Sequence, residues 1–353
     1  MSNFNPASLQ KASSRFSAHF PSPSTRGMRK RLLSISPIEV TSARRRFCVD
    51  DKDKQQQIEA VGISFLEGYH AAIECDSLLH LLEKLKTVPL DYQGFAFEGA
   101  AMGLGLLDRL LPWRHKQYAQ FLSMEWNLYP YLTHVGLGWA LARIPGGMHR
   151  FAISLIRQQT ISLDGAKPHS LLACLVLDGY GFHQSYFSWE KYVQGMVEPK
   201  SLPPECLPVF NQGVGRSLCF VLGMDAERIA HTILKFPKPR QADLWSGVGL
   251  ATAYAGGLCA QSVETLKQHA KGDLPAFAQG VAFAAKARQC AHHIPEHTQL
   301  VCQVVWEQPV ESVAGLTDST SDDLPLTSML SAYAAWRERI QQAFVSTVAY
   351  FSF

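Results

Sequence analysis

The run LDGYGFHQ at 177–184 holds the residues of this chain best suited to acid–base chemistry. An aspartate and a histidine five positions apart near the start of a helix can meet, and the carboxylate then orients the imidazole and raises its basicity. Asp178 and His183 are therefore candidates for moving a proton. A buried histidine that only completes its own hydrogen bonds is the alternative, and the residues alone do not separate the two.

A short phrase recurs along the chain, in most copies a polar residue, then Gly, any residue, and Gly or Ala. The residues before the first glycine would occupy equivalent places in successive structural units, where they could line one concave face. Each could instead cap its own helix, a role that suits Asp and Ser. Glu98 is a less natural cap and joins Asp178 and His183 as a candidate catalytic residue. The polar residues of the phrases are Glu98, Asp178, Gln212, Ser246 and Gln279.

Further polar and aromatic side chains stand in apolar segments and form a candidate substrate-binding set. Arginine is rarely buried without a partner, so Arg143 and Arg216 are each expected to pair with a carboxylate of Glu98, Asp178 or Asp243, unless they bind an anion in the groove. Aromatic residues at helical spacing are more often core than substrate contacts. The set comprises His134, Trp139, Arg143, Phe182, Arg216, Trp245 and Gln279.

The spacing of the phrases predicts the elements that hold these residues. The first glycines lie at positions 99, 136, 179, 213, 247 and 280, so successive phrases are 33 to 43 residues apart. A period in the thirties is typical of stacked helix pairs. We therefore predict an all-α fold of tandem helix-pair repeats of about 34 residues, stacked as an α-solenoid or a closed helical array. Each phrase is expected to open the first helix of a pair, with its glycines allowing a neighbouring backbone to approach.

Three segments make up the predicted domain organisation. Residues 1–26 form a basic, Ser- and Arg-rich tail that is expected to be disordered, and residues 27–320 form the helical-repeat domain. Residues 321–353 form a C-terminal amphipathic helix that closes the exposed end of the array. Second helices of pairs are expected at 226–235 and 262–271. The apolar face of the closing helix comprises Met329, Leu330, Tyr333, Trp336, Ile340, Phe344, Val345 and Val348.

Charge and composition argue against several classes of function. Residues 1–46 hold nine Lys or Arg and one acid, so the remaining 307 residues carry 24 basic and 29 acidic side chains and offer no basic stripe for nucleic acid. No stretch is long and apolar enough to span a membrane. The eight cysteines are scattered singly, which predicts buried, reduced thiols in a cytoplasmic protein. Glu67 and His70 have the Glu-x-x-His spacing of di-iron helices, but the motif occurs once, so neither a metal nor a cofactor is expected.

Taken in order, the phrases and their flanking residues resemble the domain-of-unknown-function 1702 family. The resemblance covers roughly residues 28–318 and leaves the first 25 residues and the closing helix outside. It implies a role beside iterative polyketide synthases, because family members are often labelled enediyne biosynthesis proteins, but it brings no settled reaction. The family start usually reads Arg-Gly-Phe, where this chain has Arg45-Arg46-Phe47 and loses a flexible turn. The matching motifs are GFAFEGAAM at 94–102, HVGLGWA at 134–140, DGYGFH at 178–183, QGVGRS at 212–217, DLWSGVGL at 243–250 and QGVAFAAKAR at 279–288.

Two functions fit these observations. The first is an accessory enzyme or binding protein of polyketide, enediyne-type biosynthesis that holds an apolar, polyene-like small molecule or a carrier-bound intermediate. Trp139, Phe182 and Trp245 would line its groove, while Asp178 and His183 would move a proton. The second is a non-catalytic helical-repeat scaffold that binds a partner protein such as a synthase. A deep, enclosed apolar pocket favours the first function, and an open, shallow channel favours the second.

Overall fold

The computed structural model describes residues 23–111, 116–124, 127–157, 171–324 and 328–351. About 80% of the described residues are helical and no strand occurs among them, which confirms the all-α prediction. The first 22 residues of the expected disordered tail lie outside the described residues. Its last four residues belong to the helix α2, Pro23–Leu33, which packs against α4.

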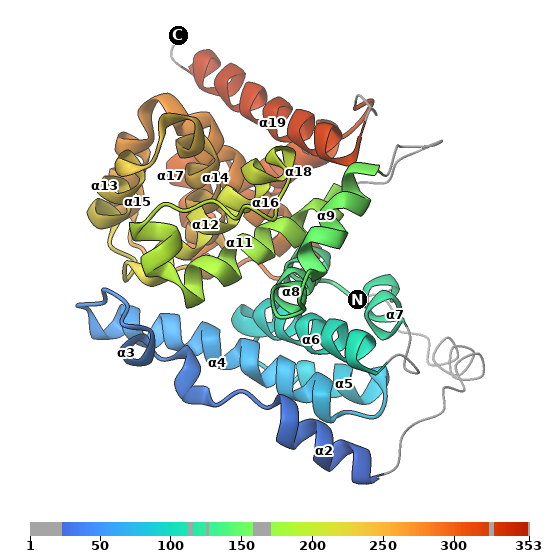
Figure 1. The fold of residues 1–353 in the computed structure, drawn as a ribbon. Helices are drawn as coiled ribbons and strands as arrows, with labels where there is room; N and C mark the ends of the chain where they lie inside the picture. The colour runs from blue at the N-terminus through green and yellow to red at the C-terminus, as the bar shows by residue number, and fades with distance from the viewer. Residues whose placement is uncertain (1–22, 112–115, 125–126, 158–170, 325–327, 352–353) are drawn as a thin grey trace, which may run out of the picture.

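Seven helices that each pack against the next one along the chain form the centre of the molecule (Figure 1). A proline at the first or second position marks the start of four of them, where its missing N–H costs no hydrogen bond. The seven are α4, Lys52–Glu74; α6, Leu90–Leu110; α8, Pro130–Ala142; α11, Leu175–Phe187; α12, Leu207–Val221; α14, Lys238–Ala255; and α16, Leu274–Cys290.

The glycine phrases lie inside these central helices, so the prediction that each phrase opens a helix is wrong. The phrase at 246–249, for example, stands in the middle of α14. Its glycines mark contacts between helices: a Cβ on Gly247 would stand 2.0 Å from the backbone oxygen of Gln212, and one on Gly213 only 1.9 Å from that of Asp178. No side chain fits at such a distance, so the close approach that was expected of these glycines is confirmed.

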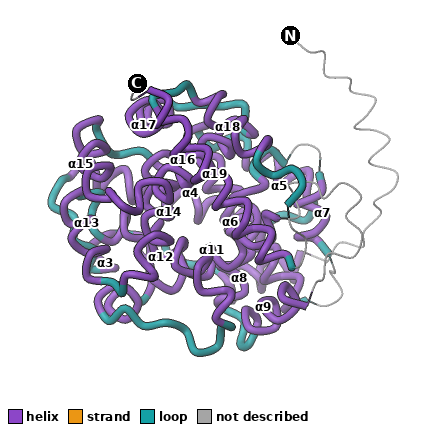
Figure 2. Tube along the Cα trace, turned by 90° about the horizontal axis from the view of Figure 1, so that it is seen from above, coloured by secondary structure: helices purple, strands orange, loops and turns teal. Residues whose placement is uncertain are grey.

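Shorter helices lie outside the central ones and cover them (Figure 2). The helices expected at 226–235 and 262–271 are present as α13, Ala226–Lys235, and α15, Ala260–Ala270. Both are amphipathic, with Ile229 and Ile233 of α13 fully buried against the core. α13 contacts α15, and α15 contacts α17, Glu296–Trp306. The remaining outer helices are α5, Leu78–Leu85; α7, Gln117–Ser123; α9, Gly147–Arg157; and α18, Val310–Ser319.

Hydrogen bonds join the first central helices to the last ones. The guanidinium of Arg288, near the end of α16, donates to the backbone oxygen of Asp91 at the start of α6, at 3.1 Å. Gln57 of α4 donates to the backbone oxygen of Ala255 at the end of α14, at 2.7 Å. The two ends of the series of central helices therefore touch one another.

An irregular segment, residues 34–49, crosses from α4 to α11 and α12, and we call it the strap. It contains a short 3-10 turn, Pro37–Val40, and the short helix α3, Ser42–Arg45. Cys48 N donates to the backbone oxygen of Val221 in α12, at 2.9 Å, and Trp189 Nε1 donates to that of Arg45, at 3.1 Å. On the other side, Ser42 N donates to Glu59 Oε1 of α4, at 3.0 Å, so the strap is bonded to both sides.

The C-terminal helix α19, Met329–Phe351, packs on α16 and α18, as its amphipathic pattern predicts. Tyr333, Trp336, Ile340 and Phe344 are buried. Val345 was assigned to the same apolar face, but its side chain is exposed.

Candidate functional site

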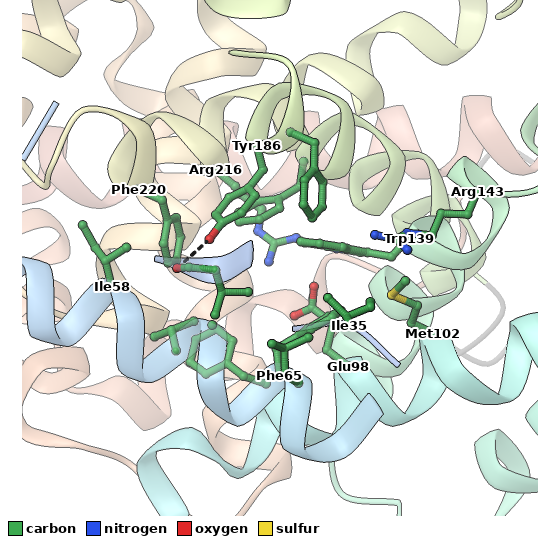
Figure 3. Close-up of a pocket in the computed structure, with 17 residues that line it drawn as sticks. Ile35, Ile58, Phe65, Glu98, Met102, Trp139, Arg143, Tyr186, Arg216 and Phe220 are labelled. Atoms are coloured by element: carbon green, nitrogen blue, oxygen red, sulfur yellow. Dashed lines mark hydrogen bonds between the residues drawn. The ribbon is translucent and has the colours of Figure 1, made fainter. Parts of the chain in front are cut away.

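A narrow apolar pocket lies between the strap and the helices α4, α6, α8, α11 and α12 (Figure 3). Its empty space comes to about 600 Å³ when the solvent at its opening is counted, whereas the cavity itself is only about 40 Å³. Arg143 is the exposed residue at the opening, while most of the other lining residues are buried. The lining comprises Ile35, Val40, Ile58, Val61, Gly62, Phe65, Leu66, Phe95, Glu98, Met102, Trp139, Arg143, Phe182, Tyr186, Phe187, Arg216 and Phe220.

Glu98 places one carboxyl group in this apolar lining, from the middle of α6. Glu98 is only 3% exposed, and no ion pair of Glu98 is found among the described residues. Burial raises the pKa of Glu98 to about 7; the charge of Arg216 opposes the rise and that of Asp178 adds to it. The indole N–H of Trp139 lowers the pKa slightly, although its geometry falls short of a full hydrogen bond. The carboxyl therefore changes its charge near neutral pH inside an apolar cavity.

Arg216 reaches the pocket from α12 and is fixed from behind by Asp178 of α11. The two buried side chains form an ion pair through Arg216 Nη1 and Asp178 Oδ1. Gln212 Nε2 donates to the other carboxylate oxygen of Asp178, at 2.8 Å. Burial alone would lower the pKa of Arg216, but the charges of Asp178 and Glu98 raise it. The expected pairing of Arg216 with Asp178 is thus confirmed.

The polar residues of the later phrases form a buried chain of hydrogen bonds that leads away from the pocket. Ser246 Oγ donates to Gln279 Oε1 at 2.8 Å and lies 3.4 Å from Gln212 Oε1. Arg337 of α19 donates to the same Gln279 oxygen at 3.1 Å and to Asp243 Oδ1 at 3.0 Å. These groups neither cap helices nor line an exposed concave face, so both interpretations of them were wrong. Asp178, Gln212, Ser246 and Gln279 are 0% exposed.

His183 does not meet Asp178, so the predicted acid–base pair is absent. Its Nδ1 lies 3.3 Å from Gln184 Oε1, and its ring packs against Trp139 and Phe187. Five positions on a helix turn the two side chains well over 90° apart, and Asp178 faces Arg216 instead. Burial lowers the pKa of His183 to about 3, and the charge of Arg143 lowers it further. The imidazole is therefore neutral at physiological pH, beside the pocket rather than in its lining.

The structure divides the expected substrate-binding set. Trp139, Arg143, Phe182 and Arg216 line the pocket. His134 bonds instead to the backbone oxygen of Pro130, at 2.7 Å. Trp245 packs against Phe277 between α14 and α16, and Gln279 belongs to the buried chain. Trp245 therefore does not line this pocket, contrary to expectation.

Several lining residues carried no signal that sequence reasoning could use. Phe65 and Ile58 come from α4, whose weak glycine phrase is the least like the others. Val40 comes from the strap, which has neither a phrase nor a regular period. Tyr186 and Phe187 directly follow the richest phrase, and that position could have identified them. Arg45, beside the opening, was hidden in a run of basic residues.

Neither a metal site nor a membrane helix is present in the described part. No three His, Cys, Asp or Glu side chains come close enough there to hold an ion. His70 Nε2 accepts a hydrogen bond from the backbone N–H of Ile35, at 3.2 Å. None of the described helices is both long and apolar enough to cross a membrane. Of the eight cysteines, all free thiols, five are buried as expected and Cys259 is exposed.

Together these features define an all-α protein with a narrow apolar pocket, into which one buried carboxyl and one buried guanidinium project. The chain belongs to the family described as Protein of unknown function (DUF1702), whose model matches residues 24–344. The match includes most of α19, which the sequence resemblance had left outside. No curated protein matches the chain, and no solved structure matches it either.

Proposed function

We propose that this protein binds an elongated apolar small molecule of polyene-like type and exchanges a proton with it at Glu98. The observation that carries the proposal is a buried carboxyl, facing an apolar pocket, whose pKa is raised to about 7. A group that titrates near the working pH both donates and accepts protons efficiently. Strongly perturbed carboxyls in clefts are typical of acid–base sites.

The pocket supports a linear, unsaturated chain better than a compact polar molecule. Phe65, Trp139 and Phe182 stand close together along it, with ring centroids 4.5 Å apart for the first two and 5.3 Å apart for the last two. Flat aromatic walls around a narrow space suit a flat conjugated chain. The family resemblance agrees, since it suggests polyketide or enediyne-type intermediates, which are chains of this kind.

The reaction that this site supports is a double-bond shift along such a chain. The Glu98 carboxylate removes a proton from one carbon, the double bond moves, and the same carboxyl returns the proton to another carbon. No oxidant or cofactor is needed, because atoms and electrons balance within the chain. Arg216 stabilises the negative charge that develops on an adjacent carbonyl oxygen, and Asp178 holds Arg216 in position.

Deuterium incorporation tests this step without knowledge of the natural product. A polyenoyl N-acetylcysteamine thioester is incubated with the protein in D₂O, and deuterium in the recovered chain is measured by mass spectrometry. We expect Glu98→Gln to bind the thioester but to exchange about 10²- to 10⁴-fold more slowly. Glu67→Gln, on the exposed face of α4, serves as the matched control. Equal exchange by wild type and Glu98→Gln would overturn the proposed chemistry.

The burial of the phrase residues favours this proposal over a protein-binding scaffold. A scaffold requires an accessible concave face, whereas Asp178, Gln212, Ser246 and Gln279 are bonded within the interior. We also propose that α12–α13, α14–α15 and α16–α17 are successive copies of one helix-pair repeat. Recovery of a synthase from lysate, with no small molecule bound to the purified protein, would favour the scaffold instead.

A further inference from the structure

The opening of the pocket differs in charge from its interior. Arg143, at the C-terminal end of α8, is the exposed residue of the lining, and its guanidinium lies 5.7 Å from the ring centre of Phe187. Arg45 of the strap stands over the same ring, 4.6 Å from its centre. Two guanidinium groups therefore flank one aromatic ring at the opening, and the charge of Arg143 contributes to lowering the pKa of Arg45.

The two arginines have different partners. Arg45 is held by Glu39, through an ion pair and through a hydrogen bond to the backbone oxygen of Glu39 at 2.7 Å. No carboxylate lies within ion-pair distance of Arg143 among the residues that the structure describes. Arg143 thus keeps its donors free for another acceptor, while Arg45 adds a fixed positive charge beside it.

The far side of the pocket is apolar. Figure 3 shows Arg143 on one side, with Ile58 and Phe220 on the other and with Glu98 and Arg216 between them. A molecule lying along this space would meet a cation at one end, the Glu98 carboxyl partway along, and hydrocarbon at the other end. Arginine is well suited to bind a carboxylate or phosphate at the first of these positions.

We propose that the ligand carries an anionic group at one end of its apolar chain and that Arg143 binds this group at the pocket opening. This inference rests on the proposed function, since it needs an apolar chain in the pocket. The anionic group has two possible sources: the carboxylate of a free acid, or the phosphate of the pantetheine arm that carries a thioester. The carboxylate stands at the start of the chain itself, whereas the phosphate stands at the far end of the pantetheine arm that precedes it.

Fluorescence binding of a conjugated C18 tetraene acid and its uncharged methyl ester tests the inference. We expect the wild-type protein to bind the acid about tenfold more tightly than the ester, or better. Arg143→Gln should lose this preference and bind the acid no more tightly than the ester. Arg150→Gln, an exposed arginine of α9 outside the pocket lining, should keep the preference.

The outcomes separate the two proposals. If the wild type binds acid and ester equally, or if Arg143→Gln keeps the preference, the proposal of an anionic group bound by Arg143 is wrong. The proposal that the pocket binds an apolar chain is not affected by that result. If neither probe binds, the proposed function fails as well. A third probe, the tetraenoyl thioester of pantetheine phosphate, separates the sources: an Arg143-dependent preference for it over the free acid identifies a carrier-delivered chain, and the reverse identifies a free acid.

Discussion

Glu98 of α6 and His183 of α11 lie beside one pocket, yet burial shifts their pKa values in opposite directions. Both groups are driven to their neutral forms, to a pKa of about 7 for the carboxyl and about 3 for the imidazole. An apolar pocket that keeps charge out is the common cause. The surroundings of Glu98 and His183 therefore favour the neutral form of each, while the Arg216–Asp178 ion pair lies beside them.

The raised pKa of Glu98 makes stability depend on pH. Between pH 4.5 and 7 the folded protein keeps a proton on Glu98 that the unfolded chain releases, so this contribution is complete below pH 4.5 and is lost as the pH rises through 7. We expect Glu98→Gln, which stays neutral, to gain stability over the wild type on going from pH 5 to pH 8, by roughly 2–3 kcal/mol. Urea unfolding of both proteins at the two pH values measures this difference.

His183 titrates over part of the same range with the opposite sign, because its lowered pKa makes acid destabilising. Comparing Glu98→Gln with the wild type at each pH removes this term, since both proteins keep the histidine. Parallel pH dependences for the two proteins would show that Glu98 does not titrate near neutrality.

At this scale the sequence predicted residue types better than partners. Glu98, Trp139, Arg143, Phe182 and Arg216 were all selected, and all line the pocket. The prediction of partners was wrong where it depended on rotation around the helix axis. Each residue along a helix turns the side chain by about 100°, so the side chains of Asp178 and His183, five positions apart, point in different directions. Val40 and Phe65 could not be found, because apolar residues that line a pocket look like those that fill a core.

At the scale of the elements, the close packing of the central helices depends on their glycines. The cost of replacing each glycine by alanine depends on how much room the added Cβ has. A Cβ on Gly213 would lie 1.9 Å from the backbone oxygen of Asp178, one on Gly105 3.0 Å from the Cβ of Ala140, and one on Gly315 would meet nothing within 4 Å. We expect Gly213→Ala to lose more than about 3 kcal/mol or not to fold, and Gly105→Ala to change little. Gly315→Ala, inside α18, should gain up to about 1 kcal/mol from helix propensity.

Thermal and urea unfolding of these three alanine variants shows whether their stabilities follow the predicted order. If Gly213→Ala does not fold, Gly105→Ala and Gly315→Ala still test the argument, because a tight contact and an open one must differ. Equal stability of all three variants would mean that the helices move apart freely, and the glycines would then need another explanation.

The strap keeps a turn that its sequence had been expected to lose. Arg46 ends α3 in the left-handed conformation, with φ 57° and ψ 38°, where the family usually has glycine. An L side chain there costs roughly 1 kcal/mol, whereas the exposed ion pair of Arg46 with Glu190 contributes little. We expect Arg46→Gly to stabilise the protein by roughly 0.5–1 kcal/mol in urea unfolding.

Arg44→Gly is the control for this position, since Arg44 lies inside α3 and is also an exposed partner in an ion pair. It should be destabilising by about 1 kcal/mol. A loss of stability in both glycine variants would contradict a strained turn at Arg46.

Element types were predictable from the sequence and element boundaries were not. Amphipathic periodicity identified α13, α15 and α19 closely. Apart from α4, the central helices are buried on nearly all sides and therefore have no clear period that reveals where they begin. Prolines such as Pro208 and Pro239 mark their starts, whereas the glycine phrases, which are more conspicuous, mark helix crossings.

For the whole molecule, the buried chain of hydrogen bonds links the pocket to the last helix. It runs from Arg216 through Asp178, Gln212, Ser246 and Gln279 to Arg337, and Tyr333 of α19 also donates to Gln212, at 3.4 Å. Helix α19 thus does more than cover an apolar face. It supplies donors to acceptors deep between α12, α14 and α16, which no amphipathic pattern could have shown.

Removal of the Arg337 side chain should therefore destabilise the central helices as well as the closing helix α19. Arg337→Met leaves the largely buried Asp243 carboxylate without its ion-pair partner and removes one of the two donors to the Gln279 oxygen. Breaking a buried ion pair typically costs 3–5 kcal/mol, about the effect we expect in urea unfolding. Arg339→Met, which changes a half-buried arginine of the same helix that donates to backbone oxygens at its surface, should cost far less. Because the chain of hydrogen bonds crosses several helices, native-state hydrogen exchange should show faster exchange in α12, α14 and α16 together with α19. Faster exchange confined to α19 would instead mean that this helix docks as an independent cover, and that the central helices hold the pocket without it.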